Sequence, residues 1–155
     1  MKISKKKILL IEETLKDFKC LIPRYTEVRD NELLFKSFCS RNRNPLWDIT
    51  NISYFKTGLM SESAKTSTDK LCDDHFVQRK LSMKLIMDSL VKNPNITVEE
   101  FIKLIKKYSS TVKITRDEHT LVSQKTKNND QYNFKVYEEL GIIVNGLDEY
   151  VGDIK

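Results

Sequence analysis

The chain has 155 residues, of which 39% are hydrophobic and 32% charged, and its 27 Lys and Arg against 22 Asp and Glu give a formal net charge of +5. This length and composition fit about one folded domain, residues 1–155, and exclude a disordered chain. No apolar run approaches the roughly 18 residues of a membrane span, so no membrane association is expected. Three cysteines without a CxxC pair favour reduced thiols in the cytoplasm, and the positive charge favours a polyanion as partner.

The first part of the chain is predicted to be helical. Apolar residues recur every three or four positions over residues 3–20, and this pattern stops before the first proline. A second helix is expected to begin at Asp30, because aspartate is a favoured N-cap, and to end at the polar run 40–45. Residues 47–60 mix an apolar helical pattern with β-branched residues, and we interpret them as a further helix.

Residues 61–70 are rich in Ser, Thr and Lys and have little to bury. They are therefore expected to form a loop, and they are the best candidate boundary between an N-terminal helical part, 1–60, and a second part, 71–155. In the second part, apolar spacing predicts helices over 81–92 and 97–109.

Two capping boxes mark helix starts in the second part, where a Thr and a Glu three positions later satisfy each other's backbone N–H groups. Thr97 with Glu100 opens one helix, and Thr115 with Glu118 opens another. Between these helices, residues 111–115 alternate apolar and polar as a short strand does. The second box therefore predicts a helix that follows directly after a strand.

The C-terminal residues are expected to form a polar loop over 125–131, a helix over 132–140 and a short strand-like segment over 142–144. Gly141 is a typical residue for ending that helix, because it adopts the left-handed conformation without steric cost. The expected fold class is α+β, mostly α-helical.

The only two histidines each follow acidic residues: His75 follows Asp73 and Asp74, and His119 stands after two further acids. A carboxylate beside an imidazole can hold a hard cation, while the imidazole stays neutral enough near pH 7 to take a proton from water. A second imidazole on a helix behind a short strand can complete the coordination and leave positions open for a phosphate oxygen.

The Asp74-His75 pair, followed by a strand that enters a helix bearing His119, resembles the HNH (ββα-metal) nuclease family. Residues 112–122, VKITRDEHTLV, look like the family's closing strand-to-helix segment. The resemblance covers residues 71–125 and implies a ββα-metal-like segment in which the two predicted helices between the histidines are an insertion. The family's asparagine before the closing strand and its zinc-binding cysteine pairs have no counterpart here.

The resemblance implies a metal-dependent endonuclease that hydrolyses phosphodiester bonds of DNA. His75 would be the base that activates water, and Asp74 and His119 would be ligands of a divalent ion, Mg²⁺ or Mn²⁺ first and Zn²⁺ as an alternative. Arg79 would act on the scissile phosphate, and Lys80 would help to bind the nucleic acid. A homodimer is also expected, because small nucleases often act as two-fold dimers on duplex DNA.

Other interpretations stay open. Arg41 and Arg43, in the predicted break after the second helix, are candidate nucleic-acid contacts with or without catalysis. The protein can instead be a non-enzymatic basic helical protein that binds nucleic acid or a protein partner. In that case Asp73 or Asp74 only caps a helix that begins near Phe76.

A zinc site is a further alternative. Cys72 and His75 have the spacing of a ligand pair, and Cys39 with His119 would complete a Cys₂His₂ set. Free cysteine is frequently a small core residue, which is the competing interpretation of Cys39.

Overall fold

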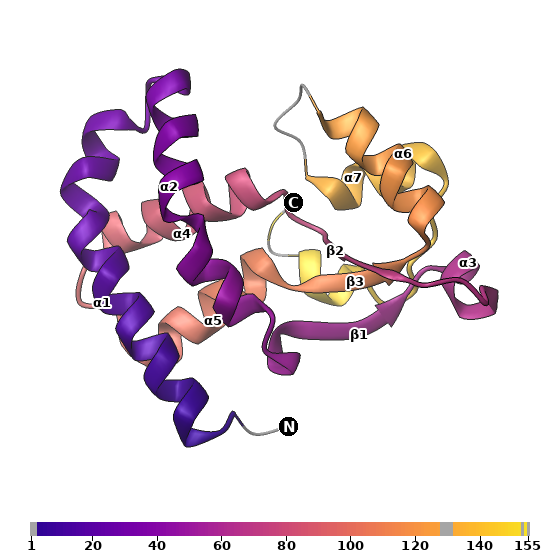
Figure 1. Ribbon diagram of the computed structural model, residues 1–155, viewed down its shortest axis with the longest axis horizontal. Helices are drawn as coiled ribbons and strands as arrows, with labels where there is room; N and C mark the ends of the chain where they lie inside the picture. Colours follow the sequence, from indigo (N-terminus) through magenta and orange to yellow (C-terminus); the bar gives the residue numbers. More distant parts are fainter. Residues whose placement is uncertain (1–2, 128–131, 153, 155) are drawn as a thin grey trace.

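The computed structural model describes residues 3–127, 132–152 and 154, apart from the side chains of Arg43 and Asn44. The chain forms two parts that lie side by side, a group of helices and a small sheet with its own helices (Figure 1). The prediction of a mostly α-helical α+β fold is confirmed. In chain order the elements are α1 (Lys5–Val28), α2 (Glu32–Thr50), the short 3₁₀ turn η1 (Ser53–Phe55), β1 (Lys56–Met60), α3 (Glu62–Thr66), β2 (Cys72–His75), α4 (Arg79–Lys92), α5 (Val98–Ser109), β3 (Thr111–Ile114), α6 (Arg116–Thr126), α7 (Asn133–Leu140) and α8 (Asp148–Val151).

The first helix is longer than predicted. It continues through Pro23 to Val28, so the expected end near residue 20 is wrong. A proline inside a helix removes one backbone donor. The turns after it nevertheless bury Tyr25 and Val28 almost completely, and this apolar burial favours continuing the helix.

The second helix differs from the prediction at both ends. Asn31, and not Asp30, is its N-cap, and its side-chain oxygen accepts a hydrogen bond of 3.0 Å from the Leu34 N–H. The polar run 40–45 does not break the helix, which continues to Thr50. Leu46 and Ile49 lie beyond that run and are fully buried, so core packing overrides the local polar pattern.

The predicted helix over 47–60 is wrong at its C-terminal end, where β1 forms instead. β1 pairs in parallel with β3, and a strand that is completed by a distant partner has a weak local signal. Gly58 in β1 has a φ of 80°, which a helix does not allow. The expected loop over 61–70 contains the short helix α3, capped by Ser61, whose Oγ accepts from the Ala64 N–H at 3.1 Å.

The sheet has the strand order β1-β3-β2, with β2 and β3 antiparallel. Asp74 lies opposite Val112 and His75 opposite Thr111. Because α6 follows β3 directly, β2, β3 and α6 together make a strand-strand-helix unit. The sequence-based prediction of a strand leading into the helix that carries His119 is confirmed.

Both predicted capping boxes are present, at the starts of α5 and α6. Gly141 ends α7 with a φ of 68°, as expected. Residues 142–144 form no strand. In the predicted loop 125–131, α6 extends to Thr126, and residues 128–131 lie outside the described residues.

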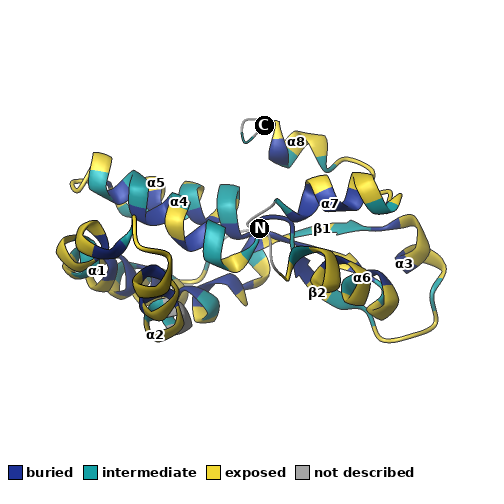
Figure 2. Ribbon diagram, turned by 90° about the horizontal axis from the view of Figure 1, so that it is seen from above, coloured by how far each residue is buried: buried dark blue, intermediate teal, exposed yellow. Residues whose placement is uncertain are grey.

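The buried apolar side chains form two cores. Figure 2 shows buried residues in both parts of the molecule. One core lies among α1, α2, α4 and α5, and the other lies among the sheet, α6, α7 and the C-terminal residues. Helices α4 and α5 thus pack with the N-terminal helices, although they follow the expected boundary at 61–70. A single domain remains a prediction. None of the helices in the described part of the chain combines the length and apolar character that a membrane span needs.

Candidate metal and catalytic site

The acidic pair that precedes His75 lies in strand β2 and not at a helix start. Helix α4 begins only at Arg79, with Gln78 at its N-cap position. The alternative in which Asp73 or Asp74 caps a helix near Phe76 is therefore wrong. Successive side chains of a strand point to opposite faces, so Asp74 and His75 face different surroundings.

The carboxylate of Asp74 is held in place from helix α7. Its Oδ2 accepts hydrogen bonds from the Tyr137 hydroxyl and, at 3.2 Å, from Asn133 Nδ2. Asn133 Nδ2 also donates to the backbone oxygen of His75 at 2.7 Å, and the Phe134 N–H donates to the backbone oxygen of Phe76 at 3.1 Å. Helix α7 thus fixes both the carboxylate and the end of β2.

The other carboxylate oxygen faces helix α6. His119 Nε2 lies 3.5 Å from Asp74 Oδ1, so the structure brings together two of the residues selected from the sequence. His119 is in the first turn of α6, whose start is fixed by the capping box of Thr115 and Glu118. Ser61 donates a further hydrogen bond of 2.7 Å to Glu118. The Asp74 side chain is 9% exposed and that of His119 is 41% exposed, so solvent reaches this pair from the histidine side.

Burial raises the pKa of Asp74 above its usual value. The hydrogen bonds from Tyr137 and Asn133 and the positive charge of His119 or Arg79 act in the opposite direction and limit this rise. Burial, together with the neighbouring Asp74 charge, also raises the pKa of Tyr137 well above its usual value, which keeps the hydroxyl protonated as a donor. The ionised carboxylate is therefore costly in its buried position. A cation near Oδ1 would offset that cost.

His75 lies in an aromatic environment. Its ring centroid is 5.9 Å from that of Trp47 on α2, and its Nε2 is buried without a hydrogen-bond partner among the described residues. Burial, followed by the positive charge of Arg79, lowers the pKa of His75 to about 4, with Asp73 opposing the shift. The imidazole is thus neutral near pH 7.

The spacing of Asp74 and His119 can be tested against metal coordination. Two ligand atoms about 2.1 Å from one ion are about 3.4 Å apart at a tetrahedral angle and about 3.0 Å apart at a right angle. The observed 3.5 Å between Asp74 Oδ1 and His119 Nε2 therefore fits two ligands of one ion. Among the described residues no group of three or more His, Cys, Asp or Glu side chains is arranged to hold a metal. The proposed four-ligand zinc site of Cys39, Cys72, His75 and His119 is therefore not formed in this structure. This chain would supply two ligands and leave the other positions to water and substrate.

The remaining predicted site residues lie in separate places. Arg79 and Lys80 begin α4, and both line a cavity against α2. Arg41 belongs to α2, contrary to its predicted position in a break, and lines a different cavity between α1 and α2. The side chain of Arg43 lies outside the described residues.

The contacts that three residues make in the site were not predicted from the sequence. Asn133 and Tyr137 are four positions apart on one face of the helix predicted over 132–140, so a polar pair on an otherwise apolar face was the available signal. Trp47 had no comparable signal, because its contact with His75 joins two distant elements.

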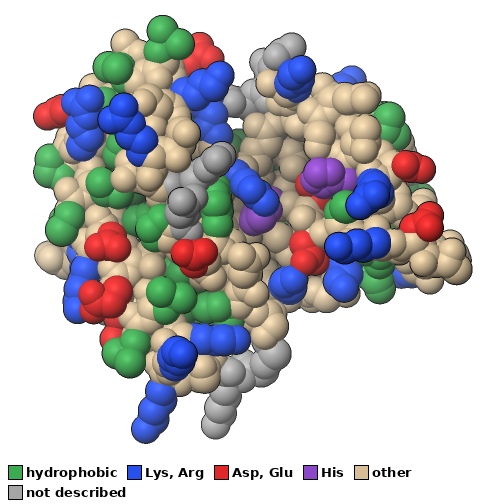
Figure 3. Space-filling model, in the orientation of Figure 1, with side chains coloured by type: hydrophobic (Ala, Val, Ile, Leu, Met, Phe, Trp, Pro, Cys, Tyr) green, Lys and Arg blue, Asp and Glu red, His purple; other side chains and the backbone are tan. Residues whose placement is uncertain are grey.

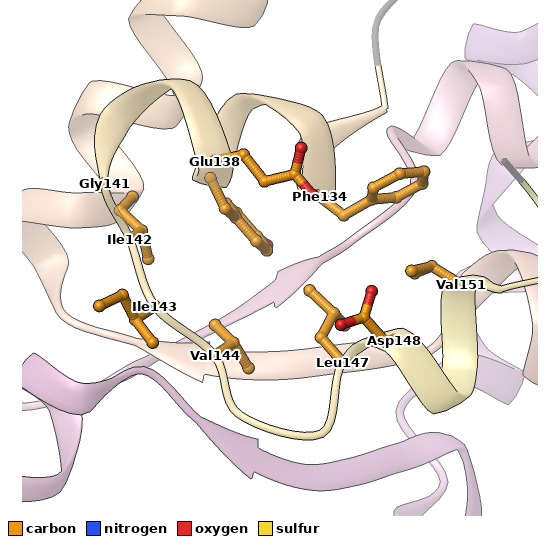
Figure 4. Close-up of a pocket in the computed structure, with 10 residues that line it drawn as sticks. Phe134, Glu138, Gly141, Ile142, Ile143, Val144, Leu147, Asp148 and Val151 are labelled. Carbon is orange, nitrogen blue, oxygen red and sulfur yellow. The ribbon is translucent and has the colours of Figure 1, made fainter.

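Another cavity, of about 260 Å³, lies between α7 and the residues that follow it. Figure 4 shows Phe134 of α7 facing Val151 and Leu147 across it. Tyr137 lines this cavity and also donates a hydrogen bond to Asp74. None of the residues predicted for the site lines the cavity. The cavity therefore backs the site and is not part of it.

The face in Figure 3 is hollowed between the two parts of the molecule, and histidine side chains lie at this hollow with Lys and Arg side chains around them. No family model, curated protein or solved structure matches the chain. The function of the protein is therefore inferred from the geometry of its site.

Proposed function

We propose that this protein is a metal-dependent nuclease that hydrolyses phosphodiester bonds of DNA. Asp74 and His119 are the ligands of a divalent ion, and His75 is the general base. The observation that carries the proposal is the 3.5 Å separation of Asp74 Oδ1 and His119 Nε2, because two elements far apart in sequence present donor atoms at the spacing of ligands on one ion.

The surroundings of Asp74 support this assignment. Ligating carboxylates in proteins are commonly oriented by hydrogen bonds to their second oxygen. Tyr137 and Asn133 make such bonds to Oδ2 and leave Oδ1 directed at His119. Mg²⁺ and Mn²⁺ suit the carboxylate oxygen, and Zn²⁺ suits the imidazole and the near-tetrahedral spacing. When bound, the ion would stabilise negative charge on the phosphate oxygens.

The role of His75 is a separate step of the proposal. A general base must be unprotonated at the working pH, and burial beside Trp47 with the charge of Arg79 lowers the pKa of His75 to about 4. Arg79 is exposed at the start of α4, where its guanidinium can face a phosphate. His75 lies on the opposite face of β2 from the Asp74 carboxylate, so its role as base requires the attacking water to reach its buried Nε2 at the end of the strand.

Two further proposals concern the cellular location and the oligomeric state of the protein. A cytoplasmic location fits the three cysteines, which are all free. A homodimer on duplex DNA remains a prediction from the chemistry of small nucleases.

The test is cleavage of supercoiled plasmid by purified protein in Mg²⁺, Mn²⁺, Zn²⁺ or EDTA, with Asp74→Asn and His119→Ala beside the wild type. Asp73→Asn is the matched control, because this neighbour is exposed and pairs with Lys56. We expect metal-dependent cutting that both site variants abolish and the control retains. Titration with Mn²⁺ gives a second readout, in which only the site variants lose binding.

A folded wild-type protein that cuts with none of these metals contradicts the proposal. Cutting that survives Asp74→Asn contradicts the ligand assignment. DNA binding without cutting would instead favour the basic binding protein that the sequence leaves open.

A further inference from the structure

A cavity of about 330 Å³ lies between α2 and α4. This volume is at the low end of ligand sites, which run from about 300 to 1,000 Å³. Its lining includes Lys36 and Trp47 from α2 with Arg79, Lys80 and Met83 from α4. The cavity belongs to the helical part of the molecule and is separate from the Asp74–His119 pair.

The charge of this lining distinguishes the cavity from the others. Lys36, Arg79 and Lys80 line it, and no acidic residue does so in the described part of the chain. The cavity beside α7 contains Glu138 and Asp148, and the two further cavities also contain aspartate. The α2–α4 cavity is therefore complementary to an anion, and its three cations suit a phosphate group.

An aromatic ring accompanies these cations. The Arg79 guanidinium carbon lies 5.2 Å from the centroid of the Trp47 ring, a cation–π arrangement. Trp47 is half-buried, and its Nε1 is a buried donor without a partner among the described residues. Cations beside an aromatic face are the combination that binds an unpaired nucleotide, with the phosphate on the cations and the base on the ring.

The position of the cavity connects it with the proposed base. Trp47 lines the cavity together with Arg79, and the centroid of its ring lies 5.9 Å from that of His75. A ligand in the cavity would thus contact the same Trp47 ring that packs against His75. We propose that this cavity binds one unpaired nucleotide of a DNA strand, with the base against Trp47 and the phosphate against Arg79, Lys36 and Lys80. The choice of DNA as occupant rests on the proposed nuclease function.

The test uses the fact that Trp47 is the only tryptophan in the chain, so all tryptophan fluorescence comes from a residue that lines the cavity. A single-stranded oligothymidylate is titrated into the full-length protein in EDTA. We expect saturable quenching that Lys36→Gln weakens by about threefold to tenfold in Kd, since one phosphate contact is lost. Arg24→Gln is the matched control, because Arg24 is an exposed α1 residue that pairs with Glu27 away from this cavity.

A second measurement follows the anisotropy of the labelled oligonucleotide. Trp47→Leu is expected to weaken binding about tenfold, because stacking of one base is lost, and Trp47→Phe to retain most of the affinity. Binding without a change in Trp47 fluorescence would overturn the proposal. So would equal affinity for thymidine monophosphate or for blunt duplex DNA, since the first needs no strand and the second has no unpaired base.

The outcomes separate this inference from the proposed function. Quenching in EDTA does not require cleavage, so a protein that never cuts DNA can still show it. Conversely, metal-dependent cutting by a protein whose Trp47 fluorescence never changes keeps the nuclease function and removes the cavity from it.

Discussion

The two faces of strand β2 differ more than its sequence suggests. On one face Asp74 has hydrogen bonds from Tyr137 and Asn133 and lies near His119. On the other face His75 packs against Trp47, and its Nε2 has no hydrogen-bond partner among the described residues.

On both faces, burial favours the neutral form of the titratable side chain. It raises the pKa of Asp74 and lowers that of His75. The difference lies in the partners: the first face is built to hold a charge in a fixed orientation, and the second keeps an imidazole uncharged. Two consecutive titratable residues can thus serve as a ligand and a base without forming an ion pair with each other.

The strongest test of this comparison is removal of the base. His75→Ala is expected to lower the rate of metal-dependent cleavage by about 10²–10⁴-fold, the usual contribution of a general base. Mn²⁺ affinity should stay close to that of the wild type, because the ligand face is intact. Single-turnover cleavage and Mn²⁺ titration measure the two effects. A rate within tenfold of wild type would remove His75 from the mechanism.

The pH dependence of stability tests the same face without catalysis. The folded pKa of His75 is about 4, below the value of about 6.5 in the unfolded chain. The unfolded state therefore binds a proton first as the pH falls, and up to about 3 kcal/mol of stability is lost between pH 6.5 and 4. Asp74, whose pKa is raised, acts in the opposite direction and reduces this slope at its acidic end.

The measurement is urea unfolding in EDTA across this pH range. His75→Gln should flatten the loss of stability, because it removes the titrating group, and Asp74→Asn should steepen it. An unchanged slope in His75→Gln would mean that His75 is protonated in the folded protein.

The partners of Asp74 give the next smaller effect. Tyr137→Phe removes the hydroxyl that donates to Oδ2, and loss of such an orienting hydrogen bond lowers metal affinity by about 10–100-fold. Tyr132→Phe is the matched control, because Tyr132 stacks on Phe134 and is not one of the hydrogen-bond donors to Asp74 among the described residues. Calorimetric titration with Mn²⁺ compares the two variants. Equal affinities would show that Tyr137 serves only the core.

The smallest effect compares the two capping boxes. Thr97→Ala and Thr115→Ala each remove an N-cap hydrogen bond, and each should lower the free energy of unfolding by about 1 kcal/mol. Only Thr115→Ala should also weaken Mn²⁺ binding, because α6 carries His119. Urea unfolding and Mn²⁺ titration check both statements. Equal metal affinity in the two variants would separate the start of α6 from the site.

The features that were predicted correctly from the sequence are local. The capping boxes, strand 111–114 and the glycine that ends α7 depend on residues within a few positions of one another. The proximity of Asp74 and His119 was implied only by the resemblance to the HNH family, in which both would be ligands of one ion, and the pairing of β2 with β3 accounts for it.

The features that were missed depend on distant partners. β1 forms because β3 pairs with it, and α1 and α2 continue through prolines because later residues such as Tyr25 and Leu46 enter the core. The contact of Trp47 with His75 joins α2 to β2, and α2 also packs against α4. None of these contacts has a signal within a short window of sequence.

The division into two cores also sets the order in which the chain can assemble during synthesis. The buried residues of the first core span Ile11 to Ile105, whereas the sheet requires β3 and the orientation of Asp74 requires Asn133 and Tyr137. Domains emerge and fold from the N-terminus while translation proceeds. The helical core can therefore close before the central strand has been synthesised, and the Asp74 carboxylate acquires its partners only after Tyr137 has emerged.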